Sequence, residues 1–559
     1  MDISRTNCSS KRKEKLMKKA DYIIKSKAVF YGFPKPPCRG CIAVKDNLII
    51  YAGNDESIVR QCTDAGTKVI DAGSHLVMPG FHDAHLHFYM SGLYDSSLVN
   101  VSFTDTSEQE CVEGLAEIAE RIPKDRWLIG AGWYHPSWDH PVLPTKKSLD
   151  MVYPDRPVCM VSADAHAMWF NSEGLKKVGL DNNIKDPQGG HYGRFPDGTL
   201  SGTVHEIAAM ALFPQIFSFT EEEENEFYRK FIHKLNSYGI TSVCDMAMTA
   251  VPGVDFIRED IYQRLLLNNE LSVRVNLYPT LENNLSRPLK MREYMTGEIL
   301  RCQGVKQFAD GVSADHTAYL KKDYANAKFS GDHGKMTIPE EDMRKMILNA
   351  HKNNVSIRIH AVGDQAIHIL LNIFEEAEQK YGQKTYLHHT LEHLENFQPD
   401  DIERMAKLHI QPSVQPEHIL IDPEGVERDL GPERIKDMWP FRRLIDSGSV
   451  LAFGTDSPDA DINPFYGLYN AVTRQSVHTK EPKGGWMPSE KITLEEALSA
   501  YTYGSACASG REQKIGLLEA GKFADIIILD SNPFEEGVER LLDTSVTMTI
   551  MNGQIIYTK

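Results

Sequence analysis

The chain has 559 residues, of which 41% are hydrophobic and 25% are charged. This ordinary globular composition excludes disordered, collagenous and coiled-coil classes of protein. Asp and Glu number 78 against 61 Lys and Arg, and no basic stripe is present to neutralise phosphates, so we expect no nucleic-acid partner.

The N-terminal segment carries a basic run at residues 11–19, and residues 1–19 are expected to form a disordered tail. No apolar segment of signal-peptide or membrane-spanning length follows it, which predicts a cytoplasmic protein without a membrane partner. The nine cysteines are scattered and odd in number, which is not a disulfide framework. Cys38 and Cys41 form a lone CxxC pair, without a second pair to complete a zinc site.

Short β-rich runs separated by Gly and Asn turns occupy both ends of the chain. The strongest hairpin signal is Asn552-Gly553, between the last two runs. Neither end can bury a sheet face alone, so residues 20–75 and 515–559 are predicted to combine in one small β-sandwich. The runs span residues 20–30, 41–44, 48–51, 68–71, 525–529, 546–551 and 554–557.

Between the two ends, apolar β-rich runs alternate with amphipathic helical patterns, which indicates βαβ units and a parallel sheet. Helices are predicted, for example, over residues 221–235, 340–352 and 364–381. Eight strand-like runs predict an α/β fold with a (β/α)8 TIM-type barrel within residues 76–514. The runs are residues 76–87, 239–246, 272–280, 304–310, 355–361, 386–393, 409–415 and 449–456.

A gap of about 150 residues separates the first two barrel runs, which is too long for a normal crossover. It predicts a subdomain inserted after the first strand, at about residues 100–238. Within it, residues 127–133 and 157–162 are expected to form strands and residues 167–177 a helix, while residues 186–202 are rich in turn signals.

Polar residues close several of these runs, and the active site of a barrel lies at the C-terminal ends of its strands. His85 and His87 alternate along the first run and therefore share one face, where both can bind one cation. Imidazole and carboxylate side chains together predict a divalent metal site and suit Zn, Fe, Mn or Ni. The other polar residues of this kind are Lys306 in the fourth run, His360 in the fifth, His393 in the sixth and Asp456 in the eighth.

Several ordered motifs resemble the amidohydrolase superfamily and, within it, the YtcJ-like branch also called amidohydrolase family 3. The resemblance covers the chain from about residue 20 to its end, and it is more specific for fold and branch than for substrate. The motifs are PGFHDAHLH at residues 79–87, GAGW at 130–133, DAHAMWFN at 164–171, GVSAD at 311–315, TLEH at 390–393, QP at 415–416, GTD at 454–456, AVTR at 471–474 and AGKFAD at 520–525.

The resemblance implies a set of metal ligands for one or two divalent ions, with zinc the expected metal. Lys306 would join this set if its amine is N6-carboxylated, because a carbamate offers two oxygens that can bridge two metals. The alternative is an unmodified lysine in a buried ion pair with Asp310 or with a substrate carboxylate. Deaminase-type members usually carry Glu where this chain has Gly363, which disfavours deamination. The other implied ligands are His85, His87, His360, His393 and Asp456.

A metal-activated water would then attack the carbonyl of a small-molecule amide, with Asp456 as the general base and next as the general acid toward the leaving nitrogen. N-substituted formamides and N-acyl amines are the substrates that the resemblance implies. The alternatives are a cyclic amide or lactone hydrolase, which needs the same chemistry, and a non-catalytic protein that uses the fold for binding or regulation. No GxSxG motif or phosphate-binding glycine motif supports a serine hydrolase or a nucleotide-binding protein.

The insertion and the barrel loops are expected to supply the substrate contacts. Asp83 and Glu392 neighbour the implied ligands and either orient them or serve local turns. The segment 319–336 is either a mobile lid or a solvated loop, and a homodimer is the expected assembly. The candidate substrate-binding residues are Trp133, Asp164, His166, Trp169, His316, Gln415 and His418.

Overall fold

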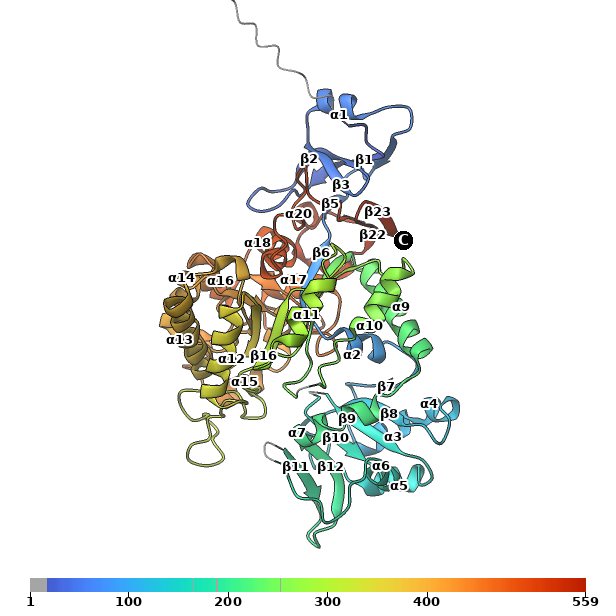
Figure 1. The fold of residues 1–559 in the computed structure, drawn as a ribbon, viewed down its shortest axis with the longest axis vertical. Coiled ribbons are helices and arrows are strands. Elements are labelled where there is room, and N and C mark those ends of the chain that lie inside the picture. The colour runs from blue at the N-terminus through green and yellow to red at the C-terminus, as the bar shows by residue number, and fades with distance from the viewer. Residues whose placement is uncertain (1–17, 164, 188–189, 252) are drawn as a thin grey trace, which may run out of the picture.

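The computed structural model describes residues 18–163, 165–187, 190–251 and 253–559. Figure 1 shows three regions along the long axis: a sheet built from both chain ends, a central region of parallel strands and helices, and the insertion at the opposite end. The predicted tail falls almost wholly on residues 1–17, outside the described residues. No helix in the described part of the chain is both long enough and apolar enough to cross a membrane.

Strands from the two chain ends hydrogen-bond in one eight-stranded sheet, in the order β23-β22-β21-β5-β1-β2-β3, with β4 paired to β1. Asn552 and Gly553 have φ values of 52° and 77°, as a two-residue type I′ hairpin between β22 and β23 requires. The two chain ends therefore share one sheet, while a second sandwich layer stays a prediction. The strands are β1 (Tyr22–Val29), β2 (Cys38–Lys45), β3 (Leu48–Gly53), β4 (Lys68–Asp71), β5 (Leu76–Pro79), β21 (Ile526–Leu529), β22 (Val546–Met551) and β23 (Gln554–Thr558).

Gly80 divides the first predicted barrel strand between two sheets. β5 lies in the sheet of the chain ends, and β6 (Phe81–Leu86) lies in the central region. A Cβ on Gly80 would lie 2.4 Å from the side chain of Thr241, so a larger residue does not fit at this crossing. The expectation of a single strand over residues 76–87 is wrong in this respect, and the crossing leads the chain directly to His85.

The central strands form two parallel sheets, in the orders β15-β14-β13-β6 and β16-β17-β18-β19-β20. Hydrogen bonds from Lys306 N to Pro279 O (2.9 Å) and from Asp456 N to His85 O (2.7 Å) tie the two sheets at both borders. The described strands do not form one continuous ladder, so the structure shows an α/β fold and barrel closure stays a prediction. The strands are β13 (Ile240–Met246), β14 (Arg274–Tyr278), β15 (Leu300–Cys302), β16 (Gly304–Phe308), β17 (Ser356–Ala361), β18 (Thr390–His393), β19 (Gln411–Val414) and β20 (Ala452–Phe453).

Helices with buried apolar faces accompany these strands. α9 (Glu221–Ser237), α12 (Glu340–Lys352) and α13 (Asp364–Tyr381) match the predicted ranges closely. α9 begins at a capping box, in which the side chains of Thr220 and Glu223 accept each other's backbone N–H bonds. The remaining helices of this region and of the chain ends are α1 (Glu56–Cys62), α2 (Phe88–Tyr94), α10 (Glu259–Leu267), α11 (Ser286–Tyr294), α14 (Pro399–Lys407), α15 (Pro423–Leu430), α16 (Phe441–Asp446), α17 (Pro464–Thr473), α18 (Leu494–Ser499), α19 (Ser505–Ala508) and α20 (Pro533–Glu536).

The insertion contains a six-stranded mixed sheet in the order β11-β12-β10-β9-β8-β7. The helix expected over residues 167–177 is wrong in its first half, because residues 167–170 form β10, which pairs with β9 and β12. Asn171 then caps α6 by accepting the N–H bond of Gly174. The elements are β7 (Asn100–Val101), β8 (Leu128–Trp133), β9 (Val158–Ser162), β10 (Ala167–Phe170), β11 (Gly190–Arg194), β12 (Leu200–Glu206), α3 (Glu108–Gly114), α4 (Ala116–Arg121), α5 (Lys146–Val152), α6 (Ser172–Lys177), α7 (Ile207–Met210) and α8 (Phe213–Ile216).

Candidate functional site

Predicted ligands from distant parts of the sequence meet at the C-terminal ends of the central strands. His85 in β6 and His87 just after it place their Nε2 atoms 3.3 and 3.2 Å from Oδ1 of Asp456, which follows β20. His393, the last residue of β18, has Nδ1 3.7 Å from Oδ2 of the same carboxylate. One ligand atom from each of His85, His393 and Asp456 lies within 4.8 Å of the other two, a spacing that can hold a metal ion.

Lys306 and His360 complete this group. Nζ of Lys306, in β16, lies 3.4 Å from Nε2 of His85. The ring of His360, in β17, lies 4.4 Å from that of His393 between centroids, and its Nε2 lies 3.2 Å from the carbonyl oxygen of Gly311. The structure therefore brings all six side chains together at one edge of the parallel sheets.

A fully buried ion-pair chain holds His85 in place. Its Nδ1 donates to Oε2 of Glu392 (2.8 Å), and Nε of Arg358 donates to the other carboxylate oxygen (2.5 Å). None of these three side chains has exposed surface. Because Nδ1 is engaged, Nε2 of His85 is the atom left to face the site, which is how carboxylates usually orient metal-binding histidines.

Asp83 orders the backbone beside the site and does not hold an imidazole in this way. Its carboxylate accepts the N–H bonds of His85 and Thr455 and the hydroxyl bond of Thr455, at 3.0, 3.1 and 2.7 Å. It thereby ties the end of β6 to the segment that carries Asp456. His87 is held separately, since its Nδ1 lies 3.0 Å from the carbonyl oxygen of Met246.

Burial decides most protonation states in the group. It lowers the pKa of His85 to about 4, that of His360 to about 3 and that of Lys306 to about 8. Burial alone would raise the pKa of Asp456, but the neighbouring imidazoles, His85 foremost, hold that pKa well below its usual range. At neutral pH His85, His360 and His393 are therefore neutral beside an ionised carboxylate, and these are the forms that bind metal ions, whereas the neighbouring Asp456 raises the pKa of His87.

Two members of the group have a left-handed backbone. φ is 70° at His393 and 61° at Asp456, a region that residues other than glycine rarely adopt. Such conformations cost on the order of 1–3 kcal/mol each and cluster at functional sites, where the surrounding structure maintains them. The turns after β18 and β20 thus hold both side chains at a conformational cost.

The position of Gly363 has no room for a side chain. A Cβ there would lie 2.1 Å from the carbonyl oxygen of Tyr319. The N–H group of Gly363 donates to Oδ2 of Asp310 (2.8 Å). The loop after β16 therefore leaves no space for a larger side chain at position 363, and the expectation against deamination stays a prediction.

A cavity of about 1150 Å³ borders the group. His87, Lys306, His360, His393 and Asp456 form one part of its wall, and β11, β12 and α7 of the insertion form another. The segment between β16 and α12 contributes much of the remainder, together with the turns after β13, β17, β18, β19 and β20. The volume exceeds the roughly 300–1,000 Å³ that is typical of ligand pockets, so a small organic molecule fits.

Three predicted substrate-binding residues lie on this wall: His166 from the insertion, His316 after β16 and His418 after β19. Nε2 of His418 lies 3.9 Å from Oδ2 of Asp456, which places this imidazole beside the candidate ligands. Asp164 lies outside the described residues.

Trp133, Trp169 and Gln415 do not border the cavity. The two tryptophans pack in an apolar core of the insertion, where their indole N–H groups donate to the carbonyl oxygens of Met160 (3.0 Å) and Thr145 (2.8 Å). Gln415 is buried, and its side-chain amide has no hydrogen-bond partner among the described residues. The motifs that contain these residues identify the fold, but they do not show which side of a strand faces a ligand.

Sequence reasoning missed several carboxyl groups on the cavity wall. Glu395 lies two residues beyond His393, and burial raises its pKa to about 8. Asp332 and Glu206 border the cavity in contact with His316 and His166, respectively. Glu395 lies beyond the strand end from which the candidate ligand His393 was predicted. No sequence signal placed the other two.

Asp310 lies on the same wall but is not paired with Lys306. Its carboxylate accepts N–H bonds from Tyr319, Val362 and Gly363, at 2.8, 3.0 and 2.8 Å. Burial raises its pKa to about 7. Among the described residues no ion pair joins Asp310 to Lys306. The expectation that an unmodified Lys306 pairs with Asp310 is therefore wrong.

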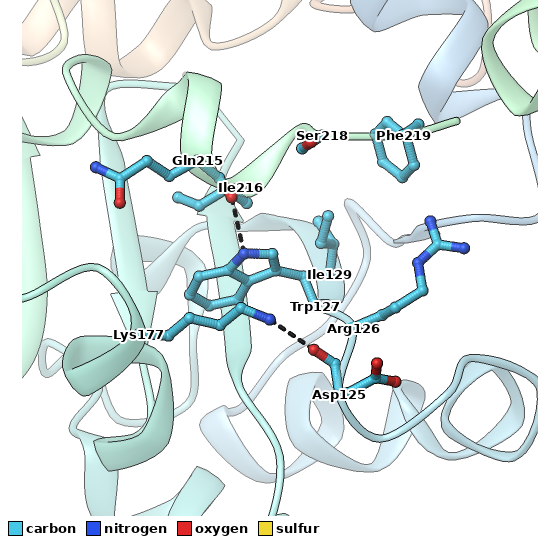
Figure 2. Close-up of a pocket in the computed structure, with 9 residues that line it drawn as sticks. All are labelled: Asp125, Arg126, Trp127, Ile129, Lys177, Gln215, Ile216, Ser218 and Phe219. Atoms are coloured by element: carbon cyan, nitrogen blue, oxygen red, sulfur yellow. Dashed lines mark hydrogen bonds between the residues drawn. The ribbon is translucent and has the colours of Figure 1, made fainter. Parts of the chain in front are cut away.

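A smaller pocket of about 240 Å³ lies beside β8, α6 and α8 (Figure 2). Its polar groups bond one another: the Trp127 indole donates to the carbonyl oxygen of Gln215 (2.9 Å), and Lys177 donates to that of Asp125 (2.6 Å). These bonds close the wall of the pocket, and we assign it no chemical role.

Comparison with known proteins shows the family of the chain. A family model described as "Amidohydrolase family" matches residues 68–557. The chain belongs to the amidohydrolase family, as its motifs indicate, and it is a metal-dependent hydrolase. The alternative of a non-catalytic binding or regulatory protein is therefore set aside.

Individual relatives match over almost the whole chain. Protein LONG AFTER FAR-RED 3 of Arabidopsis thaliana is 28% identical over 551 residues, covering 96% of this chain and 92% of that protein. The amidohydrolase YtcJ of Bacillus subtilis is 27% identical over 518 residues, covering 93% and 96%. N-substituted formamide deformylase of Arthrobacter pascens is 26% identical over 532 residues, covering 93% and 95%. An uncharacterized metal-dependent hydrolase from Pyrococcus furiosus has a similar structure, with a TM-score of 0.71 and 26% identity over 92% of this chain and 99% of that chain.

Proposed function

We propose that this protein hydrolyses an amide-type C–N bond of a small molecule by means of a metal-activated water. The observation that carries the proposal is the meeting of four histidines, Lys306 and Asp456 beside one cavity. Two relatives, YtcJ and N-substituted formamide deformylase, have names that denote this bond class, which supports the proposal.

The residues present fit a divalent cation. Oδ1 of Asp456 is buried without a hydrogen-bond partner among the described residues, although two imidazole nitrogens lie 3.2 and 3.3 Å from it. A buried carboxylate oxygen without a partner is costly, and a cation would compensate it. Zinc suits a set of imidazoles and one carboxylate. One or two ions would be held by His85, His87, His360, His393 and Asp456, with Lys306 as a further ligand after carboxylation.

A bound divalent ion lowers the pKa of water and polarises a carbonyl group. Asp456, ionised at neutral pH, takes the proton of the attacking water and passes it to the leaving nitrogen. Glu392 keeps Nδ1 of His85 protonated and its ring in one orientation. His166, His316 and His418 bind the substrate from the cavity wall.

We further propose that Lys306 is N6-carboxylated in the working enzyme. Its pKa of about 8 leaves part of the amine neutral near pH 7, and a neutral amine adds CO2 to form a carbamate with release of one proton. Three backbone N–H groups already satisfy Asp310, so that carboxylate does not hold the lysine as an ammonium ion.

We also propose how the domains of the chain are organised. The two parallel sheets are proposed to form the (β/α)8 barrel of residues 76–514, interrupted by the insertion at about residues 100–238. Residues 20–75 and 515–559 are proposed as one composite sandwich domain. The cytoplasmic location and the homodimer stay predictions from the sequence.

Metal content and amide hydrolysis test the function together. Protein purified without chelator should contain about one or two equivalents of a transition metal per chain by elemental mass spectrometry. Chelation should abolish the hydrolysis of secondary amides, and zinc with bicarbonate should restore it. His360→Asn should lose metal, whereas His233→Asn, which changes an exposed histidine of α9, should keep it. No metal after reconstitution, or hydrolysis that survives chelation, would overturn the proposal, and activity confined to lactones or cyclic amides would favour that alternative.

A further inference from the structure

His316 and Asp332 form a buried imidazole–carboxylate pair on the wall of the main cavity. Nδ1 of His316 lies 2.7 Å from Oδ2 of Asp332, and the two side chains are 6% and 5% exposed. His316 follows β16, whereas Asp332 lies in the segment 319–336, so turns of the loop bring the two together. Both residues border the same cavity as Lys306 and Asp456.

The partners of Asp332 determine where the proton of this pair lies. Its Oδ2 also accepts the N–H bond of Lys328 (2.7 Å). Burial opposes ionisation of Asp332, but this bond and the bond with His316 keep its pKa below the usual range. An ionised carboxylate only accepts hydrogen bonds, so Nδ1 of His316 carries the proton. In the neutral ring, Nε2 is then a bare acceptor.

The ring of His316 is fixed in orientation, and its Nε2 has no partner among the described residues. Tyr324 stacks on it with centroids 4.1 Å apart and planes inclined by 11°. The backbone of His316 is left-handed, with φ of 59°, which is a further sign of a conformation that its surroundings maintain. Nε2 of His316 is therefore a hydrogen-bond acceptor of fixed orientation on a residue that borders the cavity, and it can bind a molecule that carries a donor.

We propose that Nε2 of His316 accepts a hydrogen bond from the N–H group of the substrate amide, and that Asp332 is the positioning residue that fixes the required tautomer. The proposal rests on the proposed amide hydrolysis and narrows it to one substrate class. Secondary amides, R–CO–NH–R′, offer the donor that the site needs. Their N-methyl counterparts do not, and they leave Nε2 unpaired in a partly buried place.

The same loop offers a matched control pair. Nδ1 of His333 lies 3.0 Å from Oδ1 of Asp323, but these side chains are 39% and 42% exposed and do not border the cavity. A substitution there disturbs an imidazole–carboxylate pair of the segment 319–336 without touching the cavity wall.

The test compares kcat/KM for formanilide, acetanilide and butyranilide with that for their N-methyl forms. Wild-type protein should prefer the N–H amides by about 10- to 100-fold. His316→Phe keeps a ring against Tyr324 and should remove this preference. Asp332→Asn should reduce it, because an amide can hold either tautomer of the imidazole. His333→Phe and Asp323→Asn should keep it.

If His316→Phe does not fold, His316→Gln serves as the second variant. The glutamine side chain retains an acceptor oxygen, so this variant should preserve part of the preference for N–H amides over N-methyl amides. An unchanged preference in a folded His316→Phe or Asp332→Asn variant would overturn the inference while leaving amide hydrolysis in place. An equal loss in His333→Phe would also overturn it, since the order of the loop would then be the cause. If wild-type protein with metal and bicarbonate hydrolyses neither series, the proposed function falls and the inference falls with it.

Discussion

Glu392→Gln should weaken metal binding while leaving every candidate ligand in place. The substitution keeps the size of the side chain but removes the charge that faces both Nδ1 of His85 and Nε of Arg358. An amide can turn either its oxygen or its NH2 group toward His85, so the imidazole is no longer held in one tautomer. In part of the molecules Nε2 of His85 then carries the proton, and in that state it cannot bind a cation.

The expected loss can be divided into two parts. Removal of such a supporting carboxylate typically lowers metal affinity about 10- to 100-fold, or about 1.4–2.8 kcal/mol. Separately, Arg358 keeps a charge without exposed surface, and breaking a buried ion pair costs about 3–5 kcal/mol of stability. Its guanidinium retains the hydrogen bond to Ser413 (3.1 Å) and the face of Tyr278 at 5.0 Å. These contacts favour the lower end of that range.

Chelator competition measures the metal affinity, and melting of the metal-free protein measures the stability. Asp401→Asn is the matched control: Asp401 is 2% exposed and pairs with Arg404 (2.7 Å) and His368 (3.1 Å), but it lies on α14, away from the ligands. The control should lose stability without losing metal affinity. If Glu392→Gln binds metal like wild type, or if both variants lose affinity alike, the reasoning that Glu392 acts through His85 is refuted.

Asp456→Asn should lower kcat by at least about 100-fold with an unchanged circular dichroism spectrum, because the proton carrier is lost; a kcat within a few-fold of wild type would contradict that role. Lys306→Met should abolish any stimulation of activity by bicarbonate, and the native mass of wild-type protein should include one CO2 per chain; stimulation that persists in the variant would place the effect elsewhere. His389 accepts the N–H bond of Ile357 (3.2 Å) and faces His351 (3.0 Å), and burial lowers its pKa to about 3. Below about pH 6.5 the unfolded chain protonates His389 and the folded chain does not. The contribution of the neutral His389 to the free energy of unfolding is therefore complete above that pH and falls by about 1.4 kcal/mol per pH unit between about pH 6.5 and 3. In denaturant unfolding at pH 7.5 and 5, the stability of His389→Gln should fall less steeply with pH than that of wild type, by about this slope below about pH 6.5, and an equal slope would contradict the neutral state of His389.

The candidate ligands could be predicted from the order of the strands along the chain and from the periodicity within each strand. Alternation along one strand puts His85 and His87 on one side, and parallel strands deliver His360, His393 and Asp456 to the same edge. The structure brings these side chains together at the strand ends, although the left-handed turns at His393 and Asp456 were not predictable in this way. Their proposed roles as ligands still await measurement.

The cavity wall could not be predicted in the same way. Trp133 and Trp169 lie in motifs whose aromatic and polar residues suggested a binding pocket. Both side chains instead pack in an apolar core of the insertion. The contact between His316 and Asp332 depends on the turns of a long irregular segment, for which periodicity carries no information. Gly80 shows a third limit, because the switch of sheets depends on a close approach to Thr241, 161 residues away in the sequence.

The candidate ligands and the cavity wall differ in how substitutions would affect them. The ligands lie at strand ends that a buried network holds, and a change in Glu392 or Arg358 would cost stability as well as metal binding. The wall is contributed largely by the insertion and by the segment around Asp332, where substitutions leave that network intact. If the proposed ligands hold the metal, substitutions in the wall can change which amide is accepted without disturbing the metal site, and the pair of His316 and Asp332 is where that selection is expected to lie.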